Sequence, residues 1–151
     1  VTVRLELDDV DKAIIRELQV DGRAAYSRLA PEVGLSEAAV RQRVNRLQDR
    51  GVIQIVAVTD PVSLGYPIQA MVGINVSSAH DPTAEKISQI DSVDYTVMTT
   101  GRFDVLAEIV CRDTEQLIEV TNQIRDLGEV NHVEVMTYLR MVQQNYDWGT
   151  M

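Results

Sequence analysis

The feature that most constrains the fold is a helical segment that follows a tight turn at Gly34-Leu35-Ser36. After this turn, Val40, Val44 and Leu47 recur at the three- and four-residue spacing of one helix face, among polar neighbours. The serine of the turn is a favourable N-cap, and Gly51 is a favourable residue to end the helix. The pattern predicts an amphipathic helix that reaches about residue 50, with an apolar stripe that other elements must cover.

Two segments earlier in the chain are expected to form helices that cover this apolar stripe. Residues 9–20 place Ile14 and Leu18 one turn apart in a polar context, which predicts an amphipathic helix. A shorter helix is expected over 26–33, where Pro31 limits its length or regularity. Three helices with a glycine-containing turn before the last are typical of a helix-turn-helix.

The opposite face of the third helix carries side chains that suit DNA. Arginine can donate two hydrogen bonds to guanine, and glutamine or asparagine can do the same to adenine. A small residue near the helix start permits close approach, and neighbouring arginines can contact phosphates. The residues predicted to bind DNA are Ser36, Ala38, Arg41, Gln42, Asn45 and Arg46.

The net charge of −9 is unfavourable for a protein that binds nucleic acid, but the charges are unevenly distributed along the chain. Residues 1–60 hold nine basic and ten acidic side chains, whereas residues 61–151 hold five and thirteen. Within 23–50, six basic residues stand against three acidic ones. Because the local field governs contact with phosphates more than total charge does, the N-terminal part keeps a usable basic patch.

The second half of the chain alternates strand and helix patterns. Strands are expected over 69–76, 93–100, 104–111 and 130–141, with helices over 82–89 and 114–126. This βαββαβ order predicts a ferredoxin-like α+β sandwich in which helices cover one face of the sheet.

The segment that joins the two halves is also strand-like, over 52–58, and Asp60-Pro61 marks a turn after it. The sequence therefore predicts an α+β protein with an N-terminal helix-turn-helix (winged-helix-like) domain over 1–51. A linker strand or hinge follows over 52–66, and the ferredoxin-like domain for oligomerisation and effector binding occupies 67–151.

The two helices can cover only one face of the four-stranded sheet, and the other face remains substantially apolar. The apolar residues assigned to it are Met71, Met98, Leu106, Val110 and Met136. An apolar patch of this size marks an interface, which predicts at least a homodimer with the sheets facing each other.

The chain resembles the Lrp/AsnC (feast/famine) family of transcriptional regulators. The likeness lies in the runs LDDVDKAIIRELQVDGR (7–23) and LAPEVGLSEAAVRQRVNRLQDRGVIQ (29–54), and it continues through the turn Gly101-Arg102-Phe103-Asp104. Two positions depart from the family pattern: Ala25 stands where a capping residue is common, and Pro31 interrupts the second helix.

The resemblance implies double-stranded DNA as a partner, dimers that assemble into tetramers or octamers, and a small effector, typically an amino acid. The effector residues it implies are Thr100, Gly101, Arg102, Asp104, Val135 and Thr137. Backbone N–H groups and Arg102 suit a carboxylate, and Asp104 suits an ammonium group. Val135 stands where the family often has threonine, which Thr137 could replace. The alternative is an ordinary hairpin in which Gly101 supplies a positive φ and Asp104 satisfies the turn.

Other chemistry finds little support in the sequence. Cys111 is the single cysteine, in a strand-like run, and is expected to fill the core. His80 and His132 lack companions at metal-ligand spacing, so neither a metal nor a cofactor is expected. No nucleophile–base motif indicates an enzyme. The chain shows neither a signal-peptide pattern nor an apolar run that could cross a bilayer, so we expect a cytoplasmic protein.

Three functions stay open at this point. The chain is a ligand-responsive regulator of specific operators, an architectural DNA-organising protein of weak specificity, or a small-molecule sensor whose helix-turn-helix contacts protein. The base-reading face favours the first function over the second. It consists of Arg41, Gln42, Asn45 and Arg46.

Overall fold

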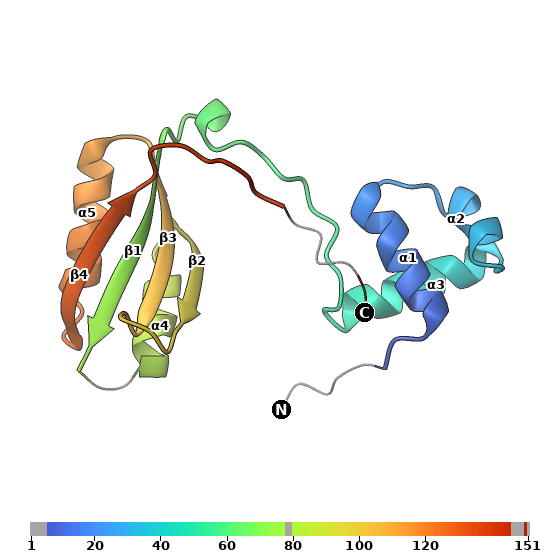
Figure 1. Ribbon diagram of the computed structural model, residues 1–151, viewed down its shortest axis with the longest axis horizontal. Coiled ribbons are helices and arrows are strands. Elements are labelled where there is room, and N and C mark those ends of the chain that lie inside the picture. The colour runs from blue at the N-terminus through green and yellow to red at the C-terminus, as the bar shows by residue number, and fades with distance from the viewer. Residues whose placement is uncertain (1–5, 78–79, 146–149, 151) are drawn as a thin grey trace. The chain divides into compact units, whose positions relative to one another are not determined.

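The computed structural model describes residues 6–77, 80–145 and 150. The chain divides into two units (Figure 1), of which the first comprises Val1–Val58 with Gln143–Met151 and the second Thr59–Val142. Each unit has a hydrophobic core of its own.

The first unit contains the three helices that the sequence predicts. They are α1 (Asp9–Val20), α2 (Tyr26–Glu32) and α3 (Glu37–Asp49). The α2 helix has only seven residues and includes Pro31, and its N-cap Ala25 makes no side-chain hydrogen bond, so Ala25 and Pro31 both fall on the shortest α-helix of the described residues. Gly51 adopts a positive φ of 66° directly after α3, which a residue without Cβ does at little cost.

The core of this unit is the predicted apolar stripe. Ile14 of α1, Leu29 of α2 and the α3 residues Val40, Val44 and Leu47 are all fully buried. Complete burial of such side chains stabilises a fold by about 1.5–3 kcal/mol each. Contact among the three helices therefore fixes which side of α3 remains exposed.

The prediction of a strand over 52–58 is wrong, because this segment is extended chain without strand pairing. Ile53 packs against the helical core, while Val56 is 68% exposed and Val58 is 59% exposed. A strand requires a hydrogen-bonded neighbour, and this segment pairs with none of the described residues. Alternating apolar residues alone do not make one.

The second unit is the βαββαβ sandwich. Its elements are β1 (Ile68–Val76), α4 (His80–Ser88), β2 (Val93–Met98), β3 (Val105–Cys111), α5 (Thr114–Arg125) and β4 (Val130–Thr137), preceded by a 3-10 turn at Val62–Leu64. The sheet order is β2-β3-β1-β4, and every neighbouring pair is antiparallel. This is the ferredoxin-like arrangement that the sequence predicts.

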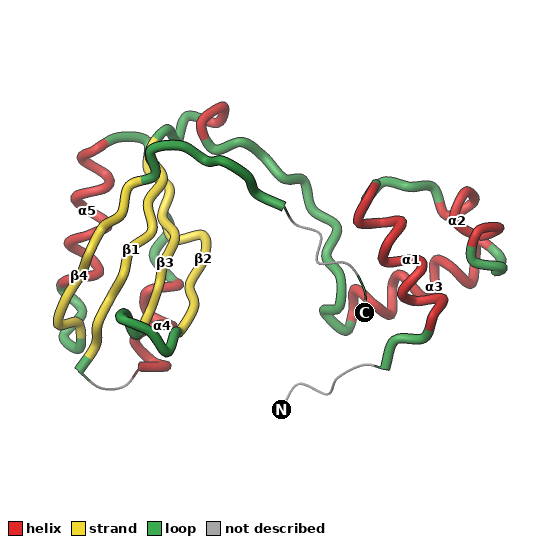
Figure 2. The backbone as a smooth tube through the Cα atoms, viewed as in Figure 1, coloured by secondary structure: helices red, strands yellow, loops and turns green. Residues whose placement is uncertain are grey.

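Both helices cover one face of this sheet (Figure 2). Val72 and Ile74 of β1, with Ala107 and Ile109 of β3, are fully buried beneath α4 and α5. Residues at alternate positions point to the opposite face, which we call the open face. On it, Leu106 and Val110 remain half-buried and Met136 is 37% exposed.

Two details of the sheet differ from prediction. The expected strand over 130–141 ends at Thr137, and Leu139 is fully exposed, because the chain after Tyr138 has no ladder partner among the described residues. Met98, assigned to the open face, pairs with the core residue Val105. Paired residues in an antiparallel ladder point to the same side, so Met98 lies at the edge of the helix-covered face.

A close contact on the open face explains a glycine within β1. A Cβ atom added at Gly73 would lie 2.6 Å from the ring of Phe103, closer than carbon atoms can approach. The aromatic ring therefore needs a residue without a side chain beneath it. Glycine in a strand interior often marks such an approach.

We predict that Gly73→Ala lowers the free energy of unfolding by about 1–3 kcal/mol, because the methyl group displaces the Phe103 ring. Chemical denaturation measures this change. Gly128→Ala is the matched control, since a Cβ there has no neighbour within 4 Å. Equal stability of the Gly73 variant and the wild type would contradict the contact.

Candidate functional site

The outward face of α3 is the first candidate site. Ser36 accepts a hydrogen bond from the N–H of Ala39 at 3.2 Å and so caps the helix start. The residues predicted for DNA contact are all exposed: Ser36, Ala38, Arg41, Gln42, Asn45 and Arg46. The buried stripe thus presents the predicted side chains to solvent on one side of the helix.

Arg41 is held along the start of α3. Its Nη2 lies 2.9 Å from Oε1 of Glu37, and its guanidinium carbon lies 5.1 Å from the ring centre of Tyr26. The side chain stays 57% exposed. An arginine in a surface ion pair keeps most of its donors for a ligand, because such a pair contributes little energy.

Arg43 and Arg46 have a different environment, which the sequence did not reveal. Oδ1 of Asp11 accepts from Arg43 at 2.7 Å, and Oδ2 accepts from Arg46 at 2.6 Å. The Asp11 side chain is fully buried. Arg43 also donates to Asp8 at 2.7 Å, and Asp8 caps α1 by accepting from the N–H of Asp11.

These contacts have consistent electrostatic effects. The hydrogen bonds from Arg43 and then from the backbone of Asp11 lower the pKa of the Asp8 carboxyl. The hydrogen bonds to Asp8 and then to Asp11 raise the pKa of Arg43. Two arginines and two aspartates therefore form a neutral cluster that joins α1 to α3, so part of the basic patch is internally compensated.

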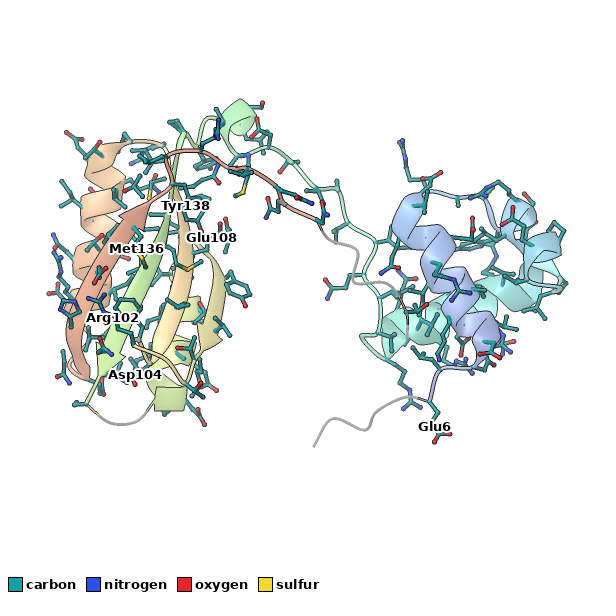
Figure 3. All side chains as sticks on the ribbon, viewed as in Figure 1. Glu6, Arg102, Asp104, Glu108, Met136 and Tyr138 are labelled. Carbon is teal, nitrogen blue, oxygen red and sulfur yellow. The ribbon has the colours of Figure 1, made fainter. Side chains whose placement is uncertain are left out.

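The second candidate site is the turn between β2 and β3. Asp104 donates its backbone N–H to the carbonyl of Ile74 at 3.0 Å, and its carboxylate accepts from the N–H of Val76 at 2.9 Å and from Asn75. The hydroxyl of Thr99 donates to the carbonyl of Phe103. These bonds fix the turn to β1. Arg102 and Asp104 lie near one end of the sheet (Figure 3).

Arg102 is the exposed cation of this turn. Its Nη2 lies 2.8 Å from Oε2 of Glu134 on β4, its guanidinium lies 5.2 Å from the Phe103 ring centre, and 75% of its side chain is exposed. Gly101 and Thr100 are exposed beside it. Positive φ angles occur at Gly34, Gly51 and Gly65 but not at Gly101, so the hairpin alternative is wrong in that detail.

One subunit does not bring all predicted effector residues together. Val135 pairs with Val72 and packs against the core, and Thr137 pairs with Ala70, so both point to the helix-covered face. Arg102 instead contacts Glu134, whose partner in β1 is Gly73 on the open face. Within one subunit, Val135 and Thr137 therefore do not face the same side of the sheet as the Arg102 guanidinium.

A polar pair within the open face was missed from the sequence. Burial, followed by the hydrogen bond to the Glu108 carboxylate, raises the pKa of Tyr138 to about 12. Glu108 pairs with Met71 in the ladder, so it lies among apolar neighbours on the open face (Figure 3). Alternation along β3 puts Glu108 on the same face as Leu106 and Val110, but nothing local in the sequence identifies Tyr138 as its partner.

The remaining candidates have ordinary environments. Burial raises the pKa of the Cys111 thiol, which fits a core residue. His132 is 58% exposed and 4.0 Å from Glu134, whereas the side chain of His80 lies outside the described residues. The described part of the chain contains no cluster of metal-ligating side chains. None of its helices is long and apolar enough to cross a membrane.

A capped recognition helix joined to a ferredoxin-like domain defines a helix-turn-helix transcription regulator with a separate ligand-binding domain. Residues 7–48 match the AsnC-type helix-turn-helix domain, and residues 69–148 match the Lrp/AsnC ligand binding domain. The chain belongs to the Lrp/AsnC family of transcriptional regulators.

Individual relatives agree with this assignment. The regulatory protein AsnC of Escherichia coli is 30% identical, over 89% of this chain and 91% of its own length. An uncharacterised HTH-type transcriptional regulator of Pyrococcus horikoshii is 34% identical, over 76% of this chain and 73% of its own. The leucine response regulatory protein of Mycobacterium tuberculosis has a similar structure, with a TM-score of 0.87 and 28% identity, covering 95% of this chain and all of that one.

Proposed function

We propose that this protein regulates transcription in the cytoplasm by binding specific operator DNA through α3, in response to an amino acid bound by the second unit. The observation that carries the proposal is the outward face of α3, where Arg41, Gln42 and Asn45 are exposed above a fully buried stripe. Arginine and amide side chains at these positions suit direct readout of bases in the major groove. The proposal includes no catalytic step, in keeping with relatives named as transcriptional regulators.

The alternative of an architectural DNA-organising protein makes a different prediction about specificity. Phosphate contact alone gives steep salt dependence but a small ratio between specific and non-specific affinity. A sensor whose helix-turn-helix contacts protein would enrich no DNA at all. Selection of duplexes from a random pool by the full chain separates the three functions.

We predict that Asn45→Ala reduces discrimination between the selected duplex and a scrambled one by about 1–3 kcal/mol, because a bidentate contact to adenine is lost. Fluorescence anisotropy with both duplexes measures the ratio of affinities. Gln48→Ala is the matched control, since Gln48 is an exposed amide in the last turn of the same helix, away from the end that contacts bases. Equal losses for the two variants would reject base reading by Asn45.

For the effector, we propose a carboxylate-binding site at the turn formed by Thr100, Gly101 and Arg102, with Asp104 as its support. The exposed guanidinium of Arg102 can form a charge-assisted pair with a carboxylate. The Asp104 carboxylate is already bonded to β1, so in this proposal it holds the turn more than it binds an ammonium group. Val135 and Thr137 would take part only if another subunit supplied them.

We predict that one or more of the twenty amino acids raises the melting temperature of the wild type, because a ligand of the folded state stabilises it. Arg102→Ala should abolish this rise with little change in ligand-free stability, since its ion pair is exposed. Asp104→Ala should lower ligand-free stability as well. Arg112→Ala, an exposed arginine at the other end of β3, is the control and should respond like the wild type. An unchanged ligand response of the Arg102 variant would place the site elsewhere.

For assembly, we propose a dimer in which two open faces meet, as a first step toward tetramers or octamers. Leu106, Val110 and Met136 give this face its apolar character, and no helix of the described chain covers it. Burial of such a patch between two subunits is favourable in proportion to its apolar area.

We predict that Leu106→Lys dissociates this dimer, because the interface would have to desolvate a charge. Sedimentation velocity reports the change in mass, and circular dichroism checks that the fold remains. Ile118→Lys on α5 is the control, since Ile118 is 55% exposed on the helical side of the unit and should leave the dimer intact. A dimer that survives Leu106→Lys would show that another surface is used.

A further inference from the structure

Asp11 is the one fully buried carboxylate among the described residues, and both of its oxygens are occupied by arginines of α3. A charge removed from water is costly unless it is paired and hydrogen-bonded. Arg43 and Arg46 lie three residues apart, on the same side of α3. A planar group on α1 that bonds to two successive turns of α3 fixes both the rotation of α3 about its axis and its position along that axis.

The apolar contacts alone leave this geometry less defined. Val40 and Val44 share one hydrophobic cluster with Ile14 and Leu18, and packed aliphatic side chains tolerate small shifts better than directional hydrogen bonds do. Bidentate recognition of a base fails when a side chain moves by about 1 Å, as preorganised sites require positions within roughly 0.5 Å. The orientation of α3 therefore matters more for reading bases than for stability.

The same contact limits what Arg46 can do. Its Nη2 donates to Asp11 at 2.6 Å, although 47% of the side chain is exposed. Bidentate recognition of guanine uses two N–H groups from one edge of the guanidinium, and the bond from Nη2 to Asp11 occupies one of the two edges that could do so. Arg43 is still more occupied, because it bonds to Asp8 and Asp11 together and is only 26% exposed.

We propose that Asp11 is a positioning residue for operator recognition, acting through Arg43 and Arg46, and that Arg46 contributes to specificity by orienting α3 and not by contacting a base. This inference rests on the proposed function, since it names how the reading helix is aligned. It reassigns Arg46 from the set predicted to contact DNA and leaves Arg41, Gln42 and Asn45 as the readers.

The test compares Arg46→Ala, Asp11→Asn and the double variant Asp11→Asn/Arg46→Ala in the full chain. The double variant keeps the wild-type net charge, so it separates orientation from simple electrostatics. Affinities are measured for a duplex selected by the wild type and for a scrambled duplex of the same composition, over a salt series. Duplex selection is then repeated with each variant that folds.

We expect each single variant to reduce the ratio of selected to scrambled affinity by about tenfold. A loss of this size corresponds to one bidentate base contact that is no longer aligned. The double variant should bind the scrambled duplex as the wild type does but keep the reduced ratio, because charge is restored and orientation is not. Repeated selection should show weaker preferences at all base pairs that α3 reads. Arg125→Ala, in the last turn of α5, is the charge control and should leave the ratio unchanged.

Two outcomes would overturn the inference. If Arg46→Ala relaxes the preference at a single base pair, then Arg46 reads that base. If it weakens both duplexes equally and lowers the salt slope by about one per subunit, then Arg46 contacts a phosphate.

Should Asp11→Asn fail to fold, Arg46→Ala decides alone, because Arg43 still pairs with Asp11 in that variant. A wild-type chain that enriches no duplex would reject the proposed function, and this inference with it.

Discussion

The burial of Val40, Val44 and Leu47 is the constraint on which the DNA-facing unit depends. With these side chains fully buried, α3 turns this face inward, and its arginine and amide groups face outward. The hydrophobic effect is not directional, so it selects the face of the helix but not its fine orientation. The hydrogen bonds from Arg43 and Arg46 to Asp11 supply that direction.

The ligand-binding unit depends on an asymmetry of its sheet. Helices α4 and α5 cover one face, so apolar residues at alternate positions on the other face remain available for association. Phe103 lies over Gly73 on this open face, and Asp104 bonds to the end of β1. The turn that carries Arg102 is therefore rigidly attached to the same sheet that we propose forms the dimer.

Patterns within single elements predicted much of this structure. Helical spacing located α1 and α3 closely. Strand alternation located the four strands, and their βαββαβ order along the chain predicted the ferredoxin-like sheet. The segment 52–58 was predicted wrongly because a strand needs a partner, which local alternation does not reveal. Met98 was misjudged for a related reason: the ladder register decides which face of the sheet a residue occupies.

The sequence by itself determined which side of each helix is apolar, where α3 begins and ends, and which polar residues α3 exposes. Those properties follow from periodicity and capping, which act over a few residues. Only the tertiary structure decided that Arg46 pairs with Asp11, 35 residues away, that Tyr138 pairs with Glu108, and that Phe103 requires Gly73. Such pairs depend on how separate elements pack against each other in space, and the spacing of residues along one element does not predict that packing.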